Sequence, residues 1–439
     1  MKKTEYGLST AIAMIVGIVI GSGIFFKSDN ILVATDGSIA LGVLVFVLAA
    51  ISIIFGGLTI SELASRYNKP GGVITYAEHS NKSMGCALGW FHTLIYYPTL
   101  VAIVSWVAGI YIFILFGIES TLLTQCLVGL ICFIGTFALN ILSVRLGGIF
   151  QNAATIIKLI PLILIAVLGL IYGDPASSVH VTDVTQMTSL GWMSAISAIA
   201  FSFDGWIVAT SVGGEIKDSK KNLPIALIFA PIFILIIYVL YFVGISSLVG
   251  PEAVIAQGDA HVDIAANMLF GPFGAKIVLI FVIISVLGTV NGLTLAIIRM
   301  PQMLAERNMF PNAKKMAVID PKYGVSVPSA IFAFAISVFW LIMHYICTTY
   351  NLLPNSDISE ISISINYIAY IYLYCQVIKL KKSGEIKSAI RGYFNPIMAC
   401  IGSLIIISGS ISNPLFILYL GISAVVVISA IVFYKKTNA

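Results

Sequence analysis

Two charged side chains stand inside long apolar stretches, where a charge is expensive to bury. Asp204 lies in the run Phe201-Ser202-Phe203-Asp204-Gly205-Trp206, and Lys158 lies in an apolar run just before Pro161. An ionisable side chain at mid-membrane costs about 2.5–3.5 kcal/mol on insertion scales and is usually functional. Asp204 could contact a ligand, or it could cap free backbone in a broken helix. Lys158 could act as a fixed ammonium in the place of Na⁺, or it could carry a coupling proton.

A glycine-rich stretch in the first apolar run suggests the partner of Asp204. Gly17, Gly21 and Gly23 interrupt this run, as Gly205 interrupts the run that holds Asp204. A helix that unwinds here presents N–H groups to a carboxylate and carbonyl groups to an ammonium. Such a pair of ends would bind a zwitterion, and an α-amino acid is the obvious one. The alternative is that Gly17 and Gly21 form a small-xxx-small pattern that only packs helices together.

The sequence contains no motif with the residue spacing of a catalytic or metal site. The five His are dispersed, and no HExxH, GxSxG or Walker-type loop appears. The six Cys are scattered singly, without a CxxC pair. We therefore expect no enzyme activity, no catalytic residues, no metal ligands and no cofactor.

Composition shows which environment must hold these residues. Apolar residues make up 59% of the 439 residues and charged residues only 10%, and the mean hydropathy is +1.03. Soluble domains carry about 25% charged residues, and disordered chains need low hydrophobicity. Both classes are excluded, and the sequence predicts an integral membrane protein.

The apolar runs predict twelve membrane-spanning helices, because each is near the length of about 20 residues that a bilayer requires. Their continuous rather than alternating hydrophobicity excludes a transmembrane β-barrel. The expected spans are 9–34, 39–62, 84–115, 121–142, 148–172, 191–213, 223–248, 272–300, 328–347, 355–378, 393–411 and 413–434. The segments 249–271 and 301–327 are expected to be loops.

Basic residues predict the orientation of these spans. Of the 24 Lys and Arg, all but Lys27, Lys158 and Lys276 fall in or beside loops on the side of the N-terminus. By the positive-inside rule, both termini are expected to be cytoplasmic. This placement also accounts for the net charge of +5 without a nucleic-acid partner.

The two interrupted spans are the first and the sixth, which is where a transporter built from two inverted repeats has its broken helices. We therefore expect one transmembrane domain over 1–439, with repeat one at about 9–172 and repeat two at about 191–378. Two additional helices would follow at about 393–434. The two halves show no convincing similarity residue by residue.

Several motifs, in this order and spacing, resemble the amino acid–polyamine–organocation superfamily, and within it the L-type amino acid transporter family. The likeness to bacterial serine/threonine and alanine/serine/cysteine exchangers runs over essentially the whole length. The motifs are Gly21-Ser22-Gly23-Ile24-Phe25, Gly56-Gly57-Leu58-Thr59, Ser61-Glu62-Leu63, Gly71-Gly72 with Tyr76, Lys158-Leu159-Ile160-Pro161, Phe203-Asp204-Gly205-Trp206, Gly214-Glu215, and Arg299-Met300 leading to Ala305 and Pro311.

The resemblance implies a LeuT-type fold and a site between the broken spans. Backbone around Ser22 and Gly23 would hold the substrate carboxylate, and nearby carbonyls would take the amino group. Phe201 matches an aromatic lid, Tyr238 a tyrosine near the site, and Lys158 the lysine associated with sodium-independent transport. The implied substrate-binding residues are Val19, Ile20, Gly21, Ser22, Gly23, Ile24, Phe201, Ser202, Phe203, Asp204 and Tyr238, with Lys158 in coupling or gating.

The resemblance further implies a sodium-independent exchanger of small neutral L-amino acids such as Ala, Ser, Thr or Cys, in the plasma membrane. The alternatives are a proton-coupled symporter of amino acids or amines and, from another class, a receptor or channel. Eukaryotic members link to an ancillary glycoprotein through a cysteine after span three. The loop from Phe116 to Thr121 has no cysteine, so we expect no such partner and a monomer. Position 204 is Asp where several members have Gly.

Overall fold

The described part of this computed structural model comprises residues 7–21, 23–67, 71–175, 191–207 and 216–438. Its regular elements are helices, and eleven helical stretches are long and apolar enough to cross a membrane. The expected all-α membrane fold is thus confirmed. The sixth expected span, 191–213, is described only to residue 207, where Gly191–Ser202 is a shorter apolar helix. The count of twelve spans and the repeat boundaries therefore stay predictions.

The first part of the chain contains several interrupted spans. Its elements are α1 (Leu8–Val19), α2 (Gly23–Phe26), α3 (Ser28–Ala34), α4 (Ile39–Ala64), α5 (Gly72–Ser80), α6 (Lys82–Phe91), the π-helical turn η1 (His92–Tyr96), α7 (Tyr97–Phe116), α8 (Leu122–Leu142), α9 (Val144–Ile157) and α10 (Leu159–Tyr172). Three expected spans are thus divided: the first into α1, α2 and α3, the third at η1, and the fifth between α9 and α10.

The second part is also mostly helical. Its elements are η2 (Gly191–Ser194), α13 (Ala195–Ser202), α15 (Ser219–Val249), α16 (Pro251–Gln257), η4 (Gly258–Ala260), α17 (His261–Ile297), α18 (Met300–Ala305), α19 (Ala313–Met316), α20 (Val327–Thr349), α21 (Ile358–Lys382), η5 (Ile390–Phe394), α22 (Asn395–Ile411) and α23 (Phe416–Thr437).

The expectation that 249–271 is a loop was wrong, because this segment forms α16, η4 and the first turns of α17. Pro251 begins α16 at a position where its missing N–H costs nothing. Gly271 takes a positive φ of 67° and kinks α17 before Pro272. Val262 and Ala265 are fully buried, so apolar packing holds the part of α17 before the kink.

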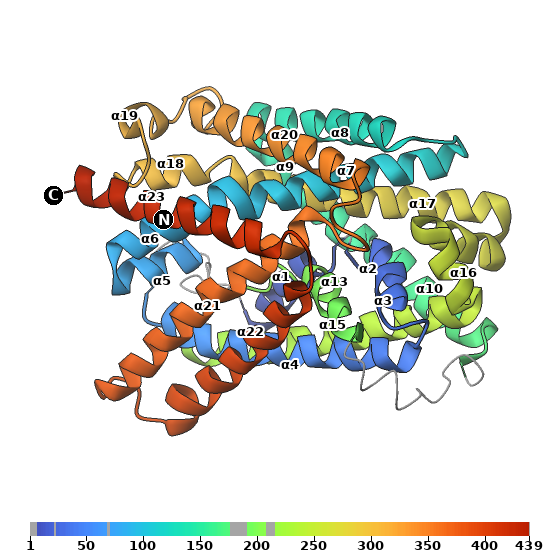
Figure 1. The fold of residues 1–439 in the computed structure, drawn as a ribbon, viewed down its shortest axis with the longest axis horizontal. Helices are drawn as coiled ribbons and strands as arrows, with labels where there is room; N and C mark the ends of the chain where they lie inside the picture. Colours follow the sequence, from blue (N-terminus) through green and yellow to red (C-terminus); the bar gives the residue numbers. More distant parts are fainter. Residues whose placement is uncertain (1–6, 22, 68–70, 176–190, 208–215, 439) are drawn as a thin grey trace.

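Short helical pieces lie at the centre of the molecule, between layers of long helices (Figure 1). In this view α1, α2 and α13 occupy the middle, with α7, α8, α17 and α20 above them and α4 and α15 below. Helices α1 and α15 pack together, as do α13 and α21. The interrupted spans are therefore enclosed by continuous helices.

Small residues let the surrounding helices approach closely. A Cβ on Gly109 in α7 would lie 2.1 Å from the Gln125 carbonyl oxygen in α8. Between α10 and α15, a Cβ on Gly169 would lie 2.6 Å from the Gly244 carbonyl oxygen. Close backbone contact at small residues is how helices associate in a bilayer, where lipid is as apolar as the helix surface. The side chains that face outward are large and apolar, for example Ile156 and Ile417.

Candidate functional site

The first span is broken between Val19 and Gly23. Helix α1 ends at Val19, and Ile20 is extended with a ψ of 98°. A Cβ on Gly23 would lie 2.8 Å from Ser202 Cα and 2.9 Å from Phe201 Cδ1. Only a glycine allows this approach without moving the backbone of the sixth span. The break in span one therefore lies directly against the end of α13.

The sixth span stops being helical at the expected place. Helix α13 ends at Ser202, and a turn follows in which Gly205 has a φ of +92°. This is a left-handed conformation that residues with a side chain rarely adopt. A Cβ on Gly205 would also lie 2.8 Å from Ile18 Cγ2. The two interruptions thus pack against each other at two places, Gly23 against α13 and Gly205 against α1.

Tyr238 in α15 joins the ends of the two broken helices. Its hydroxyl donates towards the carbonyl oxygens of Val19, at 3.1 Å, and of Ser202, at 2.9 Å. Such carbonyls have no partner within their own helix. Tyr238 is fully buried. It therefore links the end of α1 to the end of α13 and provides a hydrogen-bond donor for two carbonyl groups that unwinding exposes.

A cavity of about 310 Å³ lies beside these helix ends. Its size is at the lower end of the roughly 300–1,000 Å³ typical of small-molecule sites. It is lined by Ile18, Val19, Gly21, Gly23, Val73, His92, Tyr96, Tyr97, Leu100, Val104, Gln151, Lys158, Phe201, Ser202, Asp204, Gly205, Ile207, Thr289, Gly292, Leu293, Leu295, Ala296 and Tyr370. We call this space the central cavity.

The central cavity brings together most of the residues that the sequence predicts for a site. Those that line it are Val19, Gly21, Gly23, Lys158, Phe201, Ser202 and Asp204. The predicted residues that do not line it are Ile20, Ile24, Phe203 and Tyr238, all of which are buried in the apolar core. The ring of Phe203 packs against that of Tyr238, with centroids 5.2 Å apart. Ser22 lies outside the described residues.

Lys158 reaches the break in span one from the fifth span. Its Nζ donates to the Gly17 carbonyl oxygen at 2.5 Å, and the side chain is 4% exposed. A cation near the C-terminal end of a helix is favoured by the carbonyl dipoles there. Lys158 also separates α9 from α10, since Pro161 lacks the N–H that would bond four residues back. The Lys158 backbone keeps near-helical angles, φ −65° and ψ −23°, and its side chain extends to α1.

Asp204 faces a tyrosine of the third span. Tyr96 donates its hydroxyl to Asp204 Oδ2 at 2.5 Å, and both residues line the central cavity. Tyr96 ends the π-helical turn η1, and such turns frequently occur at functional sites. The Asp204 carboxylate is therefore held by a hydrogen bond at the cavity wall.

A polar chain beside Asp204 was not predicted from the sequence. His92 Nε2 lies 3.0 Å from Asn366 Oδ1, and the Asn366 amide donates to the Tyr370 hydroxyl at 2.9 Å. His92 and Tyr370 line the central cavity. The spacing of Ser359, Ser362 and Asn366 predicts one polar face of span ten, and that was the available signal. In the structure Ser362 bonds Thr99, at 2.6 Å, so this face packs on span three.

A second cavity of about 220 Å³ continues the central cavity towards one end of the spans. The residues that line both cavities are Val73, His92, Tyr97, Ile207 and Ala296. At its far side it reaches Gly71 and Arg299, the loop before α5 and the C-terminal end of α17. We call this end of the molecule the Arg299 end.

Interrupted helices that meet at a central cavity among membrane spans define a class of protein, the secondary transporters. The comparison with known families agrees, because the family model described as amino acid permease matches residues 6–435. This chain belongs to the amino acid permease family. It is a transporter of amino acids and not an enzyme.

Individual relatives match most of the chain. The serine/threonine exchanger SteT of Bacillus subtilis is 31% identical over 417 residues, covering 93% of this chain and 91% of its own. The human large neutral amino acids transporter small subunit 2 is 26% identical, covering 85% of this chain and 68% of its own. The cystine/glutamate transporter of Pongo abelii is 23% identical, covering 95% of this chain and 86% of its own.

Proposed function

We propose that this protein is a sodium-independent exchanger of small neutral L-amino acids. The observation that carries the proposal is the contact between the Lys158 ammonium and the Gly17 carbonyl. It supplies a fixed positive charge where the fifth span meets the broken first span. In that position a protein cation can replace a bound Na⁺, because both would neutralise the carbonyl end of α1.

The central cavity supports a small zwitterionic substrate. The proposed carboxylate site is the backbone around Ser22 and Gly23, and the proposed ammonium site is the set of carbonyls at the ends of α1 and α13. Asp204 lies at the wall of the same cavity and would add negative charge on the ammonium side. Ala, Ser, Thr and Cys are favoured, and the serine/threonine exchanger among the relatives supports this choice.

Exchange should be tested in sodium-free proteoliposomes that contain the purified chain. We expect labelled L-serine to enter vesicles preloaded with L-serine or L-alanine and not to enter empty vesicles. D-serine outside should compete poorly, and protein-free vesicles serve as the blank. Equal accumulation in empty vesicles driven by a pH gradient would replace exchange with proton symport. Uptake without saturation or stereospecific counterflow would indicate a channel.

We further propose that the protein acts in the plasma membrane as a monomer without an ancillary glycoprotein. The absence of cysteine between Phe116 and Thr121 supports the lack of a linked glycoprotein. The Arg299 end is proposed to face the cytoplasm, because Lys and Arg concentrate in the loops at that end. The second cavity would then lie on the cytoplasmic side of the central cavity.

A further inference from the structure

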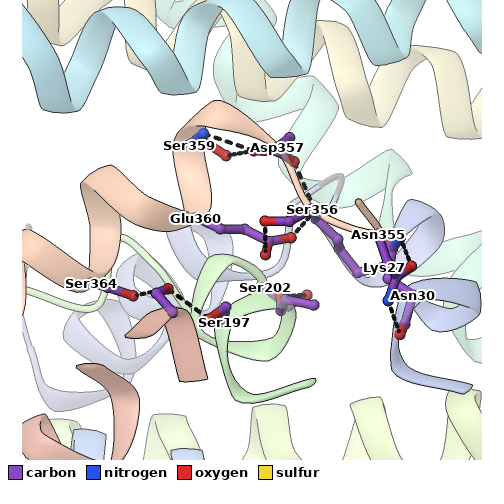
Figure 2. A network of polar contacts seen from close by, with 12 residues as sticks. Lys27, Asn30, Ser197, Ser202, Asn355, Ser356, Asp357, Ser359, Glu360 and Ser364 are labelled. Carbon is purple, nitrogen blue, oxygen red and sulfur yellow. Dashed lines mark hydrogen bonds and ion pairs between the residues drawn. The ribbon is translucent and has the colours of Figure 1, made fainter. Parts of the chain in front are cut away.

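A buried ion cluster joins the first and tenth spans on the other side of the central cavity (Figure 2). Lys27 stands between α2 and α3 and is only 2% exposed. Its Nζ lies 2.7 Å from Asp357 Oδ2 and also bonds Glu360 Oε1. Both acids belong to the start of α21, more than 300 positions away in the sequence. The cluster therefore ties together segments that only the fold brings into contact.

The two acids form a socket that does not depend on Lys27 alone. Asp357 caps α21, and its Oδ1 accepts bonds from the Ser359 backbone N–H and hydroxyl, at 2.7 and 2.5 Å. Glu360 Oε2 accepts a bond from the Ser356 hydroxyl at 2.8 Å. Each carboxylate oxygen thus has a partner, and each acid is held from within its own segment. Lys27 could leave this socket without dismantling it.

A second pair of residues makes the same connection nearer the surface. The Asn30 amide donates to Asn355 Oδ1 at 2.8 Å, and the Asn355 amide donates to the Asn30 carbonyl at 3.1 Å. These bonds join α3 to the loop that leads into α21 (Figure 2). They are exposed to solvent, so they can form and break at little cost.

Lys27 also contacts the aromatic side chains above the central cavity. Its Nζ lies 5.1 Å from the centre of the Phe26 ring and 5.5 Å from that of Phe201. The two rings meet edge to face, 5.3 Å apart. Since Phe201 lines the central cavity, the ion cluster bears directly on its wall.

The two ends of the central cavity therefore differ. Towards the Arg299 end a second cavity adjoins it, with five lining residues in common. Towards Lys27 the cavity wall includes Phe201, whose ring packs against Phe26 and lies next to the Lys27 ammonium group. A ligand could pass at that end only if α3 moved away from α21.

We propose that Lys27 is a positioning residue for transport: its bonds to Asp357 and Glu360 latch α3 onto α21 and keep Phe201 over the central cavity. The latch opens each time substrate passes at the Lys27 end. This inference rests on the proposed function, in which the central cavity is the transport site.

The energetics of buried ions favour a contact that opens and closes over one that stabilises a single arrangement permanently. Desolvation offsets most of the attraction within a buried ion pair, so such a pair adds little net stability. When α3 and α21 separate, all three groups regain water. By contrast, removing one partner while the segments stay closed leaves a buried charge without compensation. A variant that loses Lys27 should therefore favour the open arrangement.

The test measures access to the central cavity without any substrate. An Ala296→Cys variant places a thiol where the two cavities meet. The rate at which a polar maleimide labels this thiol is measured in detergent, and the labelling of the native cysteines in the protein without this substitution is subtracted. In this background Lys27→Ala should slow labelling by about tenfold, because labelling needs the arrangement open at the Arg299 end and only about a tenth of the molecules would then adopt it. Glu360→Gln should act in the same direction, and Lys27→Arg should restore most of the rate.

Kinetics then separate positioning from a general loss of structure. If Lys27→Ala favours the arrangement open at its own end, the apparent KM for substrate added at that end falls together with the maximal exchange rate. A merely destabilised protein would lose maximal rate alone. The matched control is Lys276→Ala, because Lys276 is an exposed lysine on α17.

Unchanged labelling in both Lys27→Ala and Glu360→Gln would overturn the latch. If Lys27→Ala does not fold, Glu360→Gln carries the test alone, and unchanged labelling in that variant overturns the latch. Because labelling needs no transport, a shift in labelling with no exchange by the wild type would refute the proposed function and leave the latch standing.

Discussion

At the residue scale, burial separates lysines that look alike in the sequence. Lys27 and Lys158 both depart from the positive-inside pattern, and Lys158 alone lies deep in an apolar run. The structure buries both, one in a carboxylate socket and the other on a helix carbonyl. The socket could not be predicted, because Asp357 and Glu360 lie more than 300 positions from Lys27. A sequence reveals a single charge in a long apolar run more readily than a buried charge that is paired with distant residues of opposite charge.

Removing the Lys158 ammonium should stop exchange more than it harms folding. A hydrogen bond to a charged group contributes about 1.5–3 kcal/mol, so Lys158→Ala should lower the exchange rate at least tenfold. The cause is that the C-terminal end of α1 loses its fixed cation. Exchange of labelled L-serine in proteoliposomes measures the rate, and thermal melting measures folding. Lys276→Ala, the exposed control, should behave as wild type.

Normal exchange by Lys158→Ala would remove this lysine from the mechanism. A large loss of thermal stability in Lys158→Ala alone would instead give it a structural role. Both measurements use the same purified protein, so the two results can be compared directly.

At the scale of elements, glycines predict where helices break, but proline effects were harder to place. The interruptions at Gly21 and Gly205 lie where the sequence predicts them. The division of span five at the single residue Lys158 was not predicted, although Pro161 follows it by three residues. A proline disrupts the turn before it, and the long apolar run obscured that effect. The segment 249–271 was mistaken for a loop because glycines, Pro251 and acidic residues interrupt its apolar residues.

The contact between the two broken spans should be intolerant of a single methyl group. In Gly23→Ala the new Cβ would meet Ser202 Cα at 2.8 Å, and backbone atoms cannot rotate away. Overpacking of this kind costs about 1–3 kcal/mol, and here it would push the ends of α2 and α13 apart. We expect exchange to be lost while the protein still inserts and purifies.

The matched variant for this experiment is Gly135→Ala in α8. Among the described residues, no atom outside its own helix backbone lies within 4 Å of the position of its new Cβ, and alanine is the better helix former. It should keep full exchange activity. Equal activity of Gly23→Ala and Gly135→Ala would mean that the close approach of the two breaks is unimportant for transport.

At the scale of the whole molecule, composition and periodicity predict the class of fold, because a bilayer leaves helices few alternatives. They do not predict which side of the central cavity is closed. That depends on contacts such as Lys27 with α21 on one side and on the space between Val73 and Ala296 on the other. Both are long-range packing, which local sequence patterns do not encode.

The second cavity, which adjoins the central cavity on the side of the Arg299 end, predicts one-sided access in membranes. In the Ala296→Cys variant, a membrane-impermeant maleimide should react in inside-out vesicles and hardly at all in right-side-out vesicles. L-serine should slow the reaction if it fills the same space. Glu119→Cys, in the exposed loop before α8 at the opposite end, should show the reverse sidedness. Equal labelling of Ala296→Cys from both sides would contradict a closed Lys27 end, and reversed sidedness of both variants would invert the proposed orientation.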